Sequence, residues 1–249
     1  MQLLSCSLFF LGLSQVLATD LCSISSCNGT QHLGCNNNLI FHGSCLKKRV
    51  LVNMQVYEDY LVKIHNKYRD DVASGDIPGL AKATRMPEML WHWKLALLAE
   101  YHVKRCLRNL SKYCVALTNF TTPAVSYGVS WLNVERMPDY NPKIYSEKIT
   151  MQVDQWMVQV YKLAHFYGYG ENLVEIGNIL NERNFFLGCA AGEDYDRRNS
   201  RFVLICYYDE QYNSQNPLYK PGPFEASQCP RGRSDNYAHL CKPHKDVED

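Results

Sequence analysis

After its first eighteen residues, the sequence has no apolar run long enough to cross a bilayer, since a membrane helix needs about 20 consecutive apolar residues. It also has no excess of charge of one sign, because 26 Lys and Arg stand against 25 Asp and Glu, a net charge of +1. A near-neutral chain lacks the basic surface with which proteins bind nucleic acids or anionic membranes. We therefore expect neither a membrane anchor nor a nucleic-acid partner.

The cysteines lack the closely paired spacings, such as C-x-x-C, that tetrahedral zinc sites usually show. The apolar stretch at the start, "LLSCSLFFLGLSQVLA", is short and ends on Val16-x-Ala18, a pattern typical of a signal peptide. We therefore expect residues 1–18 to be removed on export. Of the 11 cysteines, Cys6 would leave with this segment, and an even set would remain to form disulfides.

Three Asn-X-Ser/Thr patterns begin at Asn28, Asn109 and Asn119. Such patterns accept N-linked glycans on the surface loops of exported proteins. Together with the cysteines they indicate an extracellular, secreted protein. The roughly 230 residues after the apolar stretch are enough for one domain with a sizeable core and small appendages.

Apolar residues at helical spacing mark the middle of the chain. One face repeats every three or four residues and predicts a helix that ends before Gly75: Tyr57, Leu61, Ile64, Tyr68 and Val72. Similar patterns predict helices over Pro87–Arg108, Ser146–His165 and Glu171–Asn181, and residues 109–146 are expected to be irregular.

Two β-strands are predicted near the end of the chain, over Phe185–Ala191 and Phe202–Asp209. The polar run "GEDYDRRNS" between them suits a hairpin loop. Helices and strands are mixed, but not in regular βαβ units, so the fold class is α+β. We expect a sandwich in which a small, mainly antiparallel sheet lies between helices.

Five segments, in this order, resemble the CAP superfamily, which includes insect antigen 5, cysteine-rich secretory proteins and plant pathogenesis-related proteins. The segments are "DLCSISSCNGTQHLGCNN", "HNKYRDDVASG", "MPEMLWHWKLALLAEYHVKRC", "FVLICYYDEQYN" and "PLYKPGPFEASQC". The chain is similar to a divergent, fly antigen 5-like member. The resemblance implies an α-β-α sandwich, with a disulfide-stapled N-terminal loop region over 19–50, a CAP domain over 51–222 and a small C-terminal cysteine loop over 223–249.

The resemblance also implies a disulfide pairing, which the spacing of ten cysteines alone leaves open. The implied pairs are Cys22–Cys35, Cys27–Cys114, Cys45–Cys106 and Cys189–Cys206, which leaves Cys229–Cys241.

In some members of the superfamily a cleft with two His and two Glu binds a divalent cation. The matching positions of this sequence are Ser111, Val129, Gln159 and Glu175. A cation site needs three or four protein ligands, and only Glu175 keeps a charged ligand. We expect a degenerate cleft with no metal, no cofactor and no catalytic residue. His65, in "HNKYR", is expected to be structural, and His165 to be an ordinary packed or exposed residue.

Three functions compete. The first is a non-enzymatic secreted protein that binds an extracellular protein partner in saliva, venom, haemolymph or seminal fluid. The second is a carrier of a small apolar ligand, such as a sterol or fatty acid. The third is a divergent hydrolase. The four changed positions argue against the third, and we expect the chain not to be an enzyme. The sequence does not separate the first two.

Overall fold

The computed structural model describes residues 20–46, 48–107, 109–133, 142–165, 173–196, 199–213 and 216–243. The expected signal peptide and the last six residues lie outside these ranges. Within them, no helix is long and apolar enough to cross a membrane.

A five-stranded sheet forms the centre of the molecule. Its strands are β1 (Lys48–Leu51), β2 (Leu90–Trp91), β3 (Ala124–Asn133), β4 (Phe186–Asp196) and β5 (Asn199–Tyr208). The order is β1-β4-β5-β3, and these pairs are all antiparallel, whereas the short β2 runs parallel to β4. β4 therefore carries both β1 and β2 along its outer edge.

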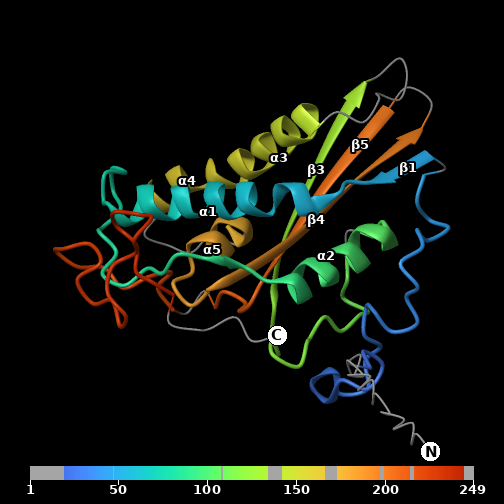
Figure 1. Ribbon diagram of the computed structural model, residues 1–249, viewed down its shortest axis with the longest axis horizontal. Helices are drawn as coiled ribbons and strands as arrows, with labels where there is room; N and C mark the ends of the chain where they lie inside the picture. The colour runs from blue at the N-terminus through green and yellow to red at the C-terminus, as the bar shows by residue number, and fades with distance from the viewer. Residues whose placement is uncertain are drawn as a thin grey trace, which may run out of the picture.

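Helices cover both faces of this sheet (Figure 1). They are α1 (Glu58–Ala73), α2 (Trp93–Arg105), α3 (Pro142–Met157), α4 (Val160–His165) and α5 (Val174–Leu180), with 3-10 turns at Ser25–Cys27 and Met54–Tyr57. One buried apolar cluster joins α1, α3 and α5 to one face, and a second joins α2 to the other. The α-β-α sandwich expected from the sequence is confirmed.

Helix α1 follows its sequence pattern closely. Leu61, Ile64 and Val72 are buried on one face. The first turn carries Glu58 and its acidic neighbour, which suit the positive end of the helix dipole. Gly75 follows the last turn with φ of +78°, a left-handed conformation that favours glycine.

The second helix begins later in the structure than the sequence predicts. Residues 87–92 are extended instead, and α2 begins at Trp93. His92 caps the helix, since its Nδ1 accepts from the Lys94 amide at 3.2 Å. The His92 amide donates to the Leu187 carbonyl at 2.8 Å, so pairing with β4 holds this segment out of the helix.

The prediction of irregular structure over residues 109–146 is wrong at β3. This strand pairs with β5 from Ala124↔Tyr208 to Asn133↔Asn199. The predicted hairpin loop is wrong as well, because Glu193↔Phe202 and Tyr195↔Ser200 continue the ladder through the polar run. The third predicted helix is interrupted at residues 158–159, between α3 and α4, and nothing in the sequence marks this break.

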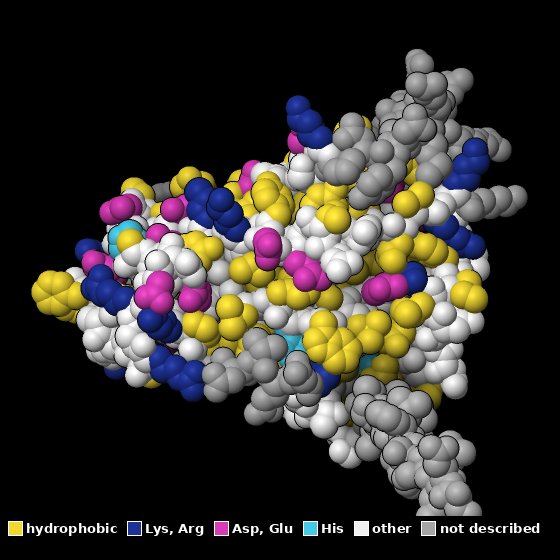
Figure 2. Space-filling model, viewed as in Figure 1, with side chains coloured by type: hydrophobic (Ala, Val, Ile, Leu, Met, Phe, Trp, Pro, Cys, Tyr) yellow, Lys and Arg dark blue, Asp and Glu magenta, His cyan; other side chains and the backbone are white. Residues whose placement is uncertain are grey.

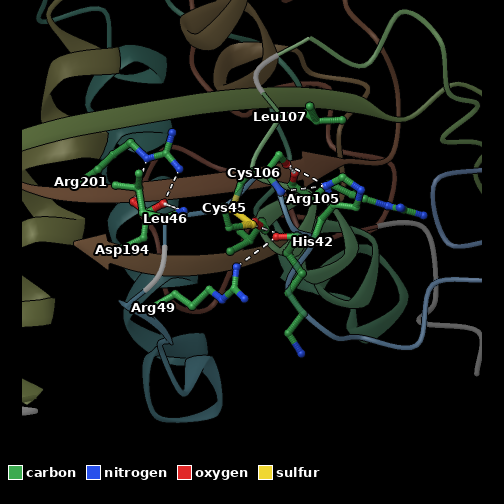
Figure 3. Close-up of a disulfide and its surroundings, with 12 residues drawn as sticks. His42, Cys45, Leu46, Arg49, Arg105, Cys106, Leu107, Asp194 and Arg201 are labelled. Carbon is green, nitrogen blue, oxygen red and sulfur yellow. Dashed lines mark hydrogen bonds and ion pairs between the residues drawn. A yellow bond between two sulfur atoms is a disulfide. The ribbon is translucent and has the colours of Figure 1, made fainter. Parts of the chain in front are cut away.

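Five disulfides staple the fold, and they join the same pairs that the resemblance implies. The Cys45–Cys106 bond ties the N-terminal segment to the end of α2 (Figure 3). Beside it, Arg49 donates to the His42 carbonyl at 3.0 Å, and Asp194 of β4 accepts from the Leu46 amide at 3.4 Å. Loss of one such bond typically costs about 2–5 kcal/mol.

Arg69 is a fully buried cation at the centre of the helical layer. Its guanidinium donates to four carbonyls: Pro87 at 2.9 Å, Ile179 at 2.6 Å, Asn181 at 3.1 Å and Asn184 at 3.3 Å. Burial lowers the pKa of Arg69 to about 9, so the side chain is still charged at neutral pH. One side chain thereby joins α1 to the end of α5 and to the segment that leads into β2.

Replacing Arg69 with Met should lower the free energy of unfolding by at least about 3 kcal/mol, because several buried carbonyls lose their donor together. Urea denaturation with intact disulfides measures this change. Lys67→Met is the matched control on the same helix: its ion pair with Asp71 is exposed, and the expected loss is below about 0.5 kcal/mol. Equal losses in the two variants would refute the central role of Arg69.

Candidate functional site

Two of the four predicted cleft positions come together in the structure. Gln159 lies in the turn between α3 and α4, and Glu175 lies in the first turn of α5. The Gln159 amide nitrogen donates to the Glu175 carboxylate at 3.3 Å. Both side chains are half-buried, so solvent still reaches the pair.

A buried polar network lies near this pair. The Nδ1 atom of His65 is 2.8 Å from the Leu61 carbonyl and therefore carries the proton, while Nε2 accepts from the Tyr208 hydroxyl at 3.0 Å. Asn178 donates to the Ser126 hydroxyl at 3.3 Å. Burial and, to a lesser extent, the charge of Glu175 raise the pKa of Tyr208. The tyrosine therefore stays protonated and acts as a hydrogen-bond donor.

The other two predicted positions lie elsewhere. Ser111 is exposed in the loop after α2, where its amide donates to the Asn109 side chain at 2.7 Å. Val129 lies on β3, where successive side chains alternate between faces. Its neighbour Ser130 donates to Gln152 of α3 at 3.1 Å, so Val129 lies on the opposite face, the one that packs against α2.

The pair of Gln159 and Glu175 provides few groups for catalysis. An amide neither donates nor accepts a proton in acid–base catalysis, so the carboxylate of Glu175 would have to work alone. Among the described residues, no group of three or more His, Cys, Asp or Glu side chains is placed to hold a metal ion. The side chain of His165 lies outside the described part of the chain. The other predicted histidine, His65, makes two buried hydrogen bonds of a structural kind.

The three expected glycan acceptors, Asn28, Asn109 and Asn119, are all exposed. A glycan on any of them would extend into solvent. Glycosylation itself stays a prediction.

Two surface grooves were not predicted from the sequence. One, of about 420 Å³, lies between α1 and the α3–α4 turn, with Tyr68, Met157 and Tyr161 among its lining residues. The other, of about 300 Å³, lies between the starts of α1 and α2, where Trp91 and Trp93 contribute to the wall. The one sequence signal for the second groove is the closely spaced pair of tryptophans in "LWHWK".

With this geometry in view, comparison with known proteins identifies the family. The sequence model of the Cysteine-rich secretory protein family, called CAP, matches residues 62–208. This is more than half of the chain, and the protein therefore belongs to the CAP family. The resemblance read from the sequence motifs is confirmed.

Similar curated proteins come from Aedes and Tabanus. Venom allergen-1 of Aedes aegypti is 25% identical over 233 residues, which cover 91% of this chain and 88% of the relative. Tabinhibitin 6 of Tabanus yao is 25% identical over 239 residues, which cover 93% and 90%. Among solved structures, BmVAL-1 aligns with a TM-score of 0.59 at 14% identity, over 80% of this chain and 99% of that chain, and shows the shared fold.

The buried histidines should make the fold sensitive to acid. Burial lowers the pKa of His65 to about 4, and burial lowers that of His102 to about 4 as well. The unfolded chain, with a histidine pKa of about 6.5, binds protons between these values that the folded state does not. Stability should therefore fall as the pH drops from about 6.5 to about 4, by up to about 1.4 kcal/mol per pH unit for each histidine.

Urea unfolding at several pH values between 7 and 4.5 measures this slope. His65→Gln should reduce the slope by the contribution of about one proton, and the double variant with His102→Gln should reduce it by that of about two. An unchanged slope in both variants would show that other groups control the acid sensitivity.

Proposed function

We propose that this CAP protein is an extracellular, non-enzymatic binder that acts on a protein partner in a body fluid. The observation that carries the proposal is the state of the cleft. Of its four positions only Gln159 and Glu175 are in contact, and this pair contains one carboxylate and no base to complement it. A fold kept rigid by disulfides, whose described cleft positions bring together no acid–base pair, is suited to presenting surface loops and grooves.

The names of similar proteins also support an extracellular binding function. The name tabinhibitin denotes an inhibitor, and inhibition is exercised by binding. The relatives named as venom allergens are consistent with release into an extracellular fluid. The five disulfides support an oxidising compartment.

One observation favours the carrier of a small apolar ligand as a second candidate. The groove between α1 and the α3–α4 turn has a volume of about 420 Å³ and apolar side chains in its wall. The same wall contains Asp76 and Asp154 besides the ion-paired Asp71, and these carboxylates would repel that of a fatty acid. Within this alternative a neutral sterol is therefore favoured over a fatty acid, and solvent extraction of the purified protein with lipid mass spectrometry distinguishes the two.

The double variant Gln159→Ala with Glu175→Ala tests the main proposal. The partner is first recovered by pull-down with the mature glycosylated protein from its own fluid and identified by mass spectrometry. Its affinity for the double variant should stay within about 1 kcal/mol of that for the parent, because the cleft lies away from the binding surface. Calorimetry of proteins matched in thermal stability measures the difference. A turnover that this double change abolishes would contradict the proposal, since general acid–base groups contribute about 10²–10⁴-fold in rate.

A further inference from the structure

Strand β4 is left without a strand partner along part of its outer edge. β1 pairs with it over residues 192–195, and β2 pairs with it over residues 186–187. In the part of the chain that the structure describes, no strand covers residues 188–191 between them. The gap is too short for a further strand, because the Leu187 and Ala191 carbonyls at its two ends already accept from the His92 and Val52 amides. It leaves a hollow beside β4 instead.

The geometry of the disulfide shows which backbone groups face this gap. Cys189 lies opposite Cys206, and their Cα atoms are 4.1 Å apart. Opposite residues this close form a non-hydrogen-bonded pair, so their N–H and C=O groups point away from each other's strand. The backbone of Cys189 therefore points to the outer edge, as does the Ala191 carbonyl, which accepts from the Val52 amide at 2.9 Å.

The groove of about 300 Å³ opens over this gap, and we call it the tryptophan groove. Cys189 and Ala190 belong to its lining. Its apolar wall includes Leu51, Met54, Trp91, Trp93 and Leu97. Trp93 is 52% exposed, although it is a large aromatic residue. Figure 2 shows hydrophobic side chains gathered on the face that carries α1 and α2, with acidic side chains beside them.

The charge of the tryptophan groove is negative. Among the residues that the structure describes, Glu58 and Glu100 line it, and no Lys or Arg does. Glu100 already pairs with Lys104 at 2.6 Å. For Glu58, the described residues supply no ion-pair partner, and burial together with the neighbouring Asp59 raises the pKa of its carboxyl group. Glu58 is thus a carboxylate that a cation from outside would stabilise.

We propose that the tryptophan groove binds an extended, arginine-bearing segment of the protein partner. This inference rests on the proposed function, binding of an extracellular protein. The segment lies along the groove, and its guanidinium lies against the tryptophan rings, in the same lining as Glu58. Arginine suits this site better than lysine, because a planar guanidinium stacks on an aromatic ring and pairs with a carboxylate at the same time. One face of Trp93 is already occupied by Lys94, 5.3 Å from the ring centre, so the incoming group uses the side that faces the groove.

Capped five-residue peptides test the inference without knowledge of the partner. The probe is Thr-Val-Arg-Val-Thr, a sequence with strong strand propensity, and its central residue is replaced by Gln or by Glu in two control peptides. Titration calorimetry with the intact protein should give the order Arg tighter than Gln, and Gln tighter than Glu, with the difference reduced at high salt. Methylguanidinium alone should bind at least about tenfold more weakly than the arginine peptide, since it lacks the contacts that the rest of the peptide makes with the apolar wall.

Two variants and their matched controls locate the site. Glu58→Gln should weaken the arginine peptide about five- to tenfold, whereas Asp59→Asn, which removes the same charge from the same helical turn outside the groove, should change binding less than about twofold. Trp93→Ala should weaken it by a similar factor. Its control, Trp131→Ala, removes a tryptophan that is 60% exposed on β3 and not part of the groove, and should have no effect.

Several results would overturn the inference. They are equal binding of the three peptides, equal effects of the Glu58 and Asp59 variants, or methylguanidinium binding as tight as the peptide. A dimer of the protein that Trp93→Ala dissociates would assign the groove to a second copy of the chain. None of these results touches the proposed function, which is tested separately by recovery of the partner, by its affinity for the double variant and by turnover at the cleft. Conversely, the peptide series reports on the groove even if the recovered partner binds elsewhere.

Discussion

The guanidinium of Arg69 is the point at which three segments that lie far apart in the sequence meet. It hydrogen-bonds carbonyls at the end of α5 and one before β2, and it does so from the middle of α1. The last carbonyls of a helix have no partner of their own and carry partial negative charge, so a buried cation is stabilised there. Because the four acceptors must converge on one planar group, they fix the positions of α1, α5 and the approach to β2 relative to one another.

The disulfides extend this constraint to the periphery. Cys27–Cys114 and Cys45–Cys106 tie the N-terminal region to the segment around the end of α2, and Cys229–Cys241 closes the C-terminal loop. The Cys241 amide donates to the Met86 carbonyl at 2.8 Å, which holds this loop against the segment before β2. A framework held at its centre by Arg69 and at its edges by covalent bonds tolerates change at exposed positions. The changes expected at the four cleft positions are therefore compatible with an intact fold.

Elements with a strong local signal were predictable from the sequence, and those that depend on distant partners were not. The apolar face of α1 and its closing Gly75 can be read directly from residue spacing. The start of α2 could not, because Pro87 resembles a first helical residue and the pairing of His92 with Leu187 is a contact across about a hundred residues. In β3, "AVSYGVSWLN", large apolar residues alternate with small or polar ones, as in a strand. The segment was still missed, because it lies among turn-forming residues and its partner β5 follows about 70 residues later.

The candidate site shows the same division. Counting from motifs located Gln159 and Glu175, which do meet, but the same counting could not reveal that Ser111 and Val129 lie apart from them. The tryptophan groove exists because two short strands leave a gap on β4, a property of the assembled sheet that no local pattern contains.

The central claim is that this CAP fold persists without the metal chemistry of its cleft. The most direct test is calorimetric titration of the purified protein with zinc at neutral pH, with the variant Glu175→Ala alongside. The account predicts no micromolar zinc site in the parent, and therefore identical titrations of parent and variant, because a stable site needs three or four ligands. A tight site in the parent that Glu175→Ala abolishes would contradict it.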